Sequence, residues 1–98
     1  MANVSFLPAA KQDYEDALEW YQARSTQAAA GFDAAMEVAL QRIAVAPELS
    51  PLLDDRHRCY VLRRYPYIVI YRVESGDVLV VAVAHARRSP SFWQGRDG

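Results

Sequence analysis

The sequence has 98 residues, of which 52% are hydrophobic and 23% charged, so it predicts a single domain over residues 1–98 and excludes a disordered chain. No apolar stretch approaches the ~20 residues of a membrane-spanning helix, which excludes an integral membrane protein. The formal net charge is only −1, but residues 50–98 carry eight arginines against five acidic residues, so the C-terminal half is basic although the whole chain is nearly neutral.

Cysteine and histidine residues are too few, and too poorly spaced, for a disulfide or a zinc site. Cys59 is the only cysteine, and His57, Cys59 and His85 do not have the spacing of zinc ligands. The amino-terminal residues lack a cationic region followed by a long apolar one, so no signal peptide is predicted. We therefore expect a cytoplasmic protein with no metal, no cofactor and no membrane partner.

Residues 1–49 predict a strand followed by two helices. The segment NVSFL alternates and predicts a strand over about residues 2–7, and Pro8 fits the first turn of a helix. The apolar stripe of this helix consists of Tyr14, Ala17, Leu18 and Tyr21. A second helix is predicted over about residues 28–46, with an apolar stripe of Phe32, Met36, Ala39, Leu40 and Ile43. The two helices should form an antiparallel hairpin, with Trp20 packed at its edge.

The second half of the sequence predicts a loop and three strands. Residues 47–55 contain two prolines and no period, so they form the loop. Strands are predicted over residues 58–65, 67–73 and 77–86, with ESGD as a hairpin turn between the last two. The fold class is therefore α+β, in the order β-α-α-β-β-β, with the helical hairpin packed on a mainly antiparallel sheet. We expect the last three strands to form a meander with the first strand alongside, which leaves the other sheet face open to a partner.

The C-terminal residues combine cations with aromatic rings directly after the most apolar strand. They are Arg87, Arg88, Phe92, Trp93 and Arg96, and these residue types dominate binding hot spots. We interpret the rings as anchors and the arginines as ligands for carboxylates or DNA phosphates; in the alternative interpretation Trp93 folds back and caps the core. His85 is a candidate general base by residue type, although a histidine at the end of a buried strand is more often structural.

Three segments together resemble the RelE/ParE superfamily of toxins from type II toxin–antitoxin modules. They are VSFLPAAKQDYEDALEWY, VLRRYPYIVIYRV and VVAVAHARRSPSFW, and they span nearly the whole chain. The RxYPY stretch and the HxRRxPxFW tail are more similar to the ParE branch, often called plasmid-stabilisation toxins, than to the RelE branch. The resemblance implies that the chain has the fold of this superfamily and acts as a toxin.

The two branches of this superfamily imply different chemistry. RelE-like toxins are ribosome-dependent mRNA endoribonucleases, which need a base, a proton donor and cations. Such members carry an arginine where this sequence has Ile68 and a C-terminal tyrosine where it has Phe92. ParE-like toxins instead inhibit DNA gyrase by binding, without catalysis. The resemblance therefore favours a gyrase inhibitor, with a ribonuclease, or a non-toxic binding module of the same fold, as alternatives.

Membership of such a module also implies a protein partner. The resemblance implies a cognate antitoxin with a ribbon-helix-helix, ParD-like DNA-binding half and an acidic, apolar segment that folds on the toxin. We expect a basic groove to receive that segment. Its candidate residues are Arg58, Arg63, Arg64, Tyr71 and Arg72.

Overall fold

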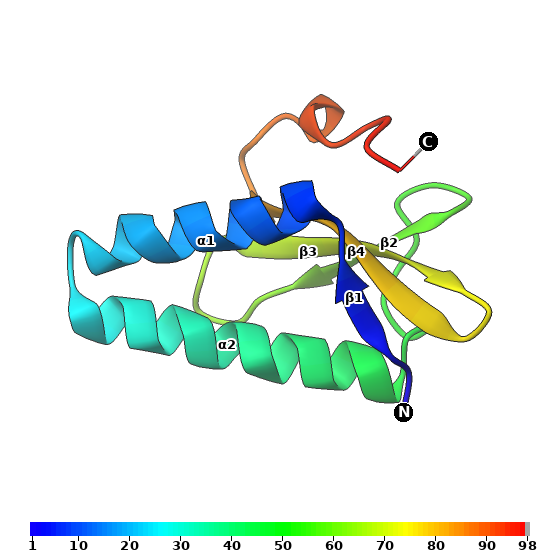
Figure 1. Cartoon of the computed structure of the whole chain (residues 1–98), viewed down its shortest axis with the longest axis horizontal. Helices are drawn as coiled ribbons and strands as arrows, with labels where there is room; N and C mark the ends of the chain where they lie inside the picture. The colour runs from blue at the N-terminus through cyan, green and yellow to red at the C-terminus, as the bar shows by residue number, and fades with distance from the viewer. Residues whose placement is uncertain (98) are drawn as a thin grey trace.

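The computed structural model describes residues 1–97 and has the predicted α+β order of elements (Figure 1). The strands are β1 (Val4–Phe6), β2 (His57–Val61), β3 (Tyr67–Glu74) and β4 (Asp77–His85). The helices are α1 (Pro8–Gln22) and α2 (Thr26–Val45), and a short 3-10 helix, η1, covers Pro90–Phe92. Within the described residues, neither helix is long and apolar enough to cross a membrane.

The four strands form one sheet in the order β1-β4-β3-β2. β2, β3 and β4 are the predicted antiparallel meander, and β1 lies alongside β4, in parallel. The sequence left this strand order open. β2 is four residues shorter than predicted at its C-terminal end, because Arg64 has a φ of +71° and turns the chain before Pro66, which has no N–H for the ladder.

Both helices begin at residues with a clear physical role. Pro8 occupies the first turn of α1, where its missing N–H needs no partner. The hydroxyl of Ser25 accepts a 3.1 Å hydrogen bond from the backbone N–H of Ala28, so α2 starts at Thr26 rather than at residue 28 as predicted. The interruption in the helical pattern at RSTQ is therefore a helix cap.

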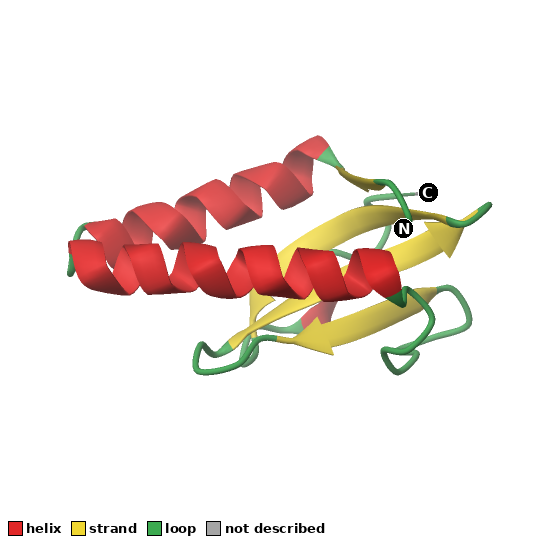
Figure 2. Cartoon of the chain, turned by 90° about the horizontal axis from the view of Figure 1, so that it is seen from below, coloured by secondary structure: helices red, strands yellow, loops and turns green. Residues whose placement is uncertain are grey.

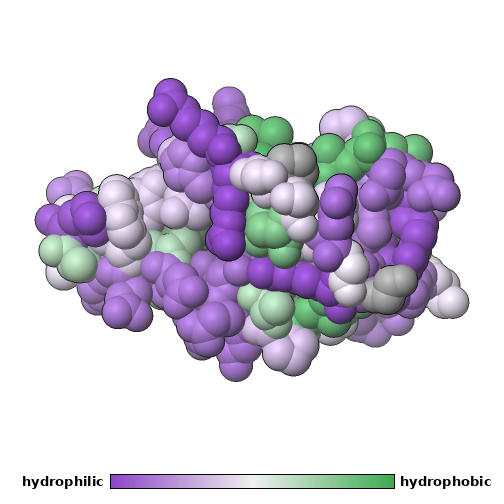
Figure 3. All heavy atoms as spheres, turned by 90° about the horizontal axis from the view of Figure 1, so that it is seen from above, coloured by the Kyte–Doolittle hydropathy of each residue, from purple (hydrophilic) through white to green (hydrophobic). Residues whose placement is uncertain are grey.

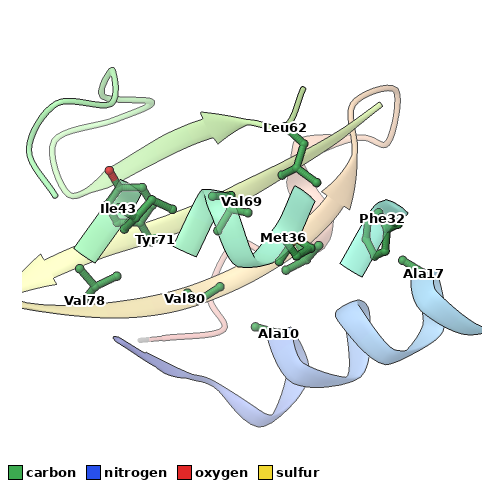
Figure 4. Packing of buried hydrophobic residues seen from close by; sticks show 12 residues of the cluster. Ala10, Ala17, Phe32, Met36, Ile43, Leu62, Val69, Tyr71, Val78 and Val80 are labelled. Carbon is green, nitrogen blue, oxygen red and sulfur yellow. The ribbon is translucent and has the colours of Figure 1, made fainter. Parts of the chain in front are cut away.

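The main core lies between the helical hairpin and one face of the sheet, as Figures 2 and 4 show. Its centre contains Phe32 and Met36 of α2, which are fully buried against residues of β3 and β4. The predicted apolar stripes of both helices face this core. Its fully buried strand residues are Val69, Tyr71, Val78 and Val80.

The opposite face of the sheet is covered in part by the C-terminal segment, which we define as residues 86–97. Trp93 packs there on Ile70, Val81 and Ala82, and is only 4% exposed. A register shift between β3 and β4 at Ile70 makes these strand side chains available on this face. The expectation that this face is left open is therefore wrong, because the apolar residues of the central strands need cover on both sides.

A close helix–turn contact at Gly31 leads to a stability prediction. A Cβ atom at this position would overlap the hydroxyl group of Tyr65, which donates a hydrogen bond to the Ala28 carbonyl. We expect Gly31→Ala to lower the free energy of unfolding by about 1–3 kcal/mol, although alanine is the better helix former. Urea denaturation measures this loss. In a Tyr65→Phe background the loss should be smaller, and an equal loss there would contradict the steric explanation.

Candidate binding surface at the basic end of the sheet

Four arginine side chains are exposed at one end of the sheet, which we call the basic end. Arg63 and Arg64 lie in the β2–β3 turn, and Arg87 and Arg88 follow β4. The first residue of β3 pairs with the last residue of β4, so the turn and the C-terminal segment emerge side by side. Cations far apart in the sequence are thus exposed at the same end of the sheet, which suits an acidic or phosphate-bearing partner.

A small cleft adjoins the basic end and contains an aromatic ring that the sequence did not assign to a site. Its lining includes Trp20, His85 and Arg88, with Asp16 on the α1 side. Trp20 packs edge-on against Tyr21, as expected for the edge of the hairpin, but it is 50% exposed. The helical period places it outside the apolar stripe of α1, but the cleft beside it depends on how α1 lies on the sheet.

His85 is positioned by a hydrogen bond that limits its chemistry. Its Nδ1 accepts a 3.1 Å hydrogen bond from the backbone N–H of Arg87, so the neutral ring carries its proton on Nε2. The ring lies edge-on to Tyr67, with centroids 5.4 Å apart, and burial raises the pKa of that phenol. In this state neither His85 nor Tyr67 is a free general base.

Arg96 is held by α1 and β4 and is not part of the open surface. Its guanidinium pairs with Asp13 at 2.7 Å and donates to the Val81 carbonyl at 3.1 Å. Asp13 in turn accepts a 3.1 Å hydrogen bond from Val83 N–H. β1 pairs with the edge of β4 only as far as Val80. Beyond that point, Asp13 and Arg96 provide the hydrogen-bond partners that a neighbouring strand would otherwise give to the backbone of β4. Arg96, which was predicted to bind a target, is therefore engaged in an internal ion pair.

The two aromatic residues of the C-terminal segment differ in exposure. Trp93 is buried on the sheet, so the alternative interpretation, in which it caps a core, describes its position, and its assignment as an anchor stays a prediction. Phe92 is half-buried, with the guanidinium groups of Arg88 and Arg96 at 3.9 Å and 5.0 Å from its ring centroid. Hydrophilic residues cover most of this side of the molecule, between smaller hydrophobic patches (Figure 3).

The predicted basic groove does not form as one site. Arg58 donates to the carbonyls of the loop before β2, at 2.9 Å and 2.7 Å, and Tyr71 is fully buried in the core. Arg72 points to the opposite face and pairs with Asp97 at 2.9 Å, because successive residues of a strand alternate between faces. Among the five predicted residues, only Arg63 and Arg64 are exposed.

An apolar groove that the sequence did not indicate runs along α2. It has a volume of about 630 Å³, and Val38, Val45, Leu49 and Tyr60 contribute to its lining. Val45 is 64% and Leu49 is 83% exposed. A second hollow shares part of this lining and continues to Arg63 and Arg64 of the basic end. The groove therefore joins an apolar floor to a cationic end.

The comparisons with known proteins found one family model and a solved structure with a similar fold. The family model described as "ParE toxin of type II toxin-antitoxin system, parDE" matches residues 4–90. A solved structure described as "Chromosomal ParDE TA system from P. aeruginosa" has a TM-score of 0.63 at 13% identity, over 87% of this chain and 96% of that chain. At this identity the likeness shows the fold alone. No curated protein matches the chain.

Proposed function

Since the chain belongs to the ParE toxin family of type II toxin–antitoxin systems, we propose that it inhibits DNA gyrase by binding and that a cognate antitoxin neutralises it. The observation that supports this proposal is the basic end, where Arg63, Arg64, Arg87 and Arg88 are exposed together. Such a surface is suited to grip a macromolecule without covalent chemistry. Its target would be met in the cytoplasm.

The chemistry at the basic end favours binding over RNA cleavage. An endoribonuclease must take a proton from the 2′-hydroxyl group, but Nδ1 of His85 is already a hydrogen-bond acceptor. Ile68 and Phe92, which stand where the resemblance implies an arginine and a tyrosine in RelE-like members, pack against the apolar cluster around Trp93. Neither side chain can transfer a proton.

The apolar groove along α2 fits the proposed antitoxin. An acidic segment with an apolar stripe would bury the exposed Val45 and Leu49 and place carboxylates near Arg42, Arg63 and Arg64. Folding of a disordered segment on this surface is coupled folding and binding. We propose a ParD-like antitoxin whose ribbon-helix-helix half binds operator DNA.

The direct test is incubation of the purified chain with gyrase and supercoiled plasmid. We expect cleaved plasmid to accumulate in a trapped gyrase–DNA complex, and the protein encoded beside the toxin to prevent this when it is added in equimolar amount. A translating lysate assayed for mRNA fragments is the parallel arm.

Each outcome of this experiment decides between the candidate functions. Ribosome-dependent mRNA fragments without gyrase complexes would replace the proposal with an endoribonuclease. Inactivity in both arms, with a folded protein, would favour a non-toxic binding module. Failure of the neighbouring protein to bind or to prevent the effect would remove the antitoxin part of the proposal.

A further inference from the structure

A buried histidine is one of the groups that attach the end of the C-terminal segment to the sheet, together with Arg72 of β3. His57, the first residue of β2, is 6% exposed and packs edge-on with the Trp93 ring, with centroids 4.8 Å apart. Its Nδ1 lies 2.9 Å from the nearer carboxylate oxygen of Asp54, and its Nε2 lies 2.9 Å from Oδ2 of Asp97. Both ring nitrogens therefore face carboxylate oxygens, which only accept hydrogen bonds.

Both carboxylates are fixed by other groups, so neither can readily turn away from the ring. Asp54 accepts hydrogen bonds from the backbone N–H groups of Arg56 and His57, at 2.8 Å and 2.6 Å. Asp97 is 4% exposed at its side chain and pairs with Arg72 at 2.9 Å and with Arg56 at 3.8 Å. The ring must carry a proton on each nitrogen to donate to both.

We propose that His57 is a pH-sensitive latch, whose imidazolium form holds the C-terminal segment on the sheet and whose neutral form loosens it. The neutral ring has a single N–H. If this N–H faces Asp97, the contact weakens from an ion pair to a hydrogen bond from a neutral donor to the carboxylate, and if it faces Asp54, a lone pair faces Asp97. The attachment of the segment is weaker in either tautomer.

The groups around His57 determine the direction of the pH response. Burial by itself lowers the pKa of His57, but the hydrogen bonds and charges of Asp97 and Asp54 outweigh it, so the pKa lies above the usual 6.5. For Asp97, burial by itself raises the pKa, but the hydrogen bond and charge of His57 and the charge of Arg72 outweigh burial. The pKa of Asp97 is therefore lowered. Glu74 faces Arg72 at 2.6 Å and shares its charge.

The C-terminal segment is therefore held most strongly at pH values between the pKa of Asp97 and the pKa of His57. The contribution of His57 is fully present below pH 6.5 and is lost as the pH rises through its raised pKa. The contribution of Asp97 is lost only as the pH falls through its lowered pKa, below 3.8. Around neutral pH, the protonation of His57 is the variable that changes.

Two buried polar atoms explain why the attachment of the C-terminal segment is sensitive to the protonation of His57. Among the described residues, Arg72 Nε and Trp93 Nε1 are buried without a hydrogen-bond partner. Each such group opposes docking of the segment, because it gives up water without a replacement. The charge-assisted contact of His57 helps to offset that cost, so its loss shifts the docking equilibrium.

The experiment is an NMR titration of the full chain, between about pH 6 and about pH 9. We expect the ring of His57 to titrate with a midpoint above 6.5. The backbone N–H of Arg96, which bonds to the Trp93 carbonyl, should lose protection from hydrogen exchange with the same midpoint, about tenfold beyond the chemical effect of pH. A midpoint at or below 6.5, or unchanged protection through the midpoint, would overturn the proposal.

Two matched variants separate the latch from general electrostatics. Asp97→Asn should lower the midpoint of His57, whereas Asp55→Asn, which removes the same charge from an exposed neighbour, should leave it near the wild-type value. Equal midpoints in both variants would contradict the latch. His57→Gln should abolish the pH dependence of the Arg96 protection, and since these readouts do not involve gyrase, they stand apart from the proposed function.

Discussion

The double variant Arg87→Ala/Arg88→Ala is expected to bind gyrase about 1,000-fold more weakly than the wild type and to lose its toxicity. Both side chains are exposed at the basic end, beside the turn that contributes Arg63 and Arg64. An arginine at the centre of an interface contributes about 2 kcal/mol or more, and two such losses correspond to about three orders of magnitude in Kd. Binding to immobilised gyrase and growth after induction are the two measurements.

The control for this variant removes two positive charges elsewhere. Lys11→Ala/Arg56→Ala changes the net charge equally, at exposed positions outside the basic end, and should retain binding and toxicity. The free energy of unfolding of the Arg87/Arg88 variant should stay within about 1 kcal/mol of the wild-type value. The main internal contact that the two substitutions remove is the stacking of Arg88 on Phe92. Equal loss of binding in both variants would show that net charge, rather than the basic end, drives association.

The second large effect is expected from Asp13→Ala, which should lower the free energy of unfolding by about 3 kcal/mol. The change removes the partner of the Arg96 guanidinium and the acceptor of the Val83 N–H. An uncompensated buried charge and an unpaired backbone donor are among the costliest defects in a small domain. Chemical denaturation, with the exchange rate of the Val83 amide as a local readout, measures the loss.

Asp16→Ala is the matched control, because Asp16 lies one turn further along α1. It makes an exposed hydrogen bond with Gln12, and its removal should change stability by no more than about 0.5 kcal/mol. If both aspartate variants lose the same stability, the loss in Asp13→Ala does not come from the contacts of Asp13 at the edge of β4. If Arg96→Ala loses as much as Asp13→Ala, the bond to Val83 contributes little.

The fold was predictable because it follows from local patterns. The stripes at Tyr14, Ala17 and Tyr21 and at Phe32 and Met36 have the helical period, and they face the core as expected. Turn residues such as those of ESGD separate the strands at the expected places. Boundaries were missed, for example at the Ser25 cap and at the left-handed Arg64, and so was the cover that the C-terminal segment gives to the second face of the sheet.

The site was predicted only in part. The sequence grouped Arg87 and Arg88 with Trp93 and Arg96, because they follow one another along the chain. The structure separates them: the first two are exposed, Trp93 is buried on the sheet, and Arg96 pairs with Asp13. The role of Asp13 was not predicted, because helical periodicity cannot show an unpaired edge of a strand that lies 70 residues away along the chain.

The sequence by itself determined the order of the elements, the apolar faces and the family resemblance, since these depend on the spacing of residues within about twenty positions. Only the tertiary structure decided which cations remain free. It places the β2–β3 turn beside the end of β4, and it gives Arg72 and Arg96 acceptors that are 25 and 83 positions away in sequence. The physical reason is that a buried or half-buried arginine takes the nearest acceptor in space, and that neighbour exists only once the chain has folded.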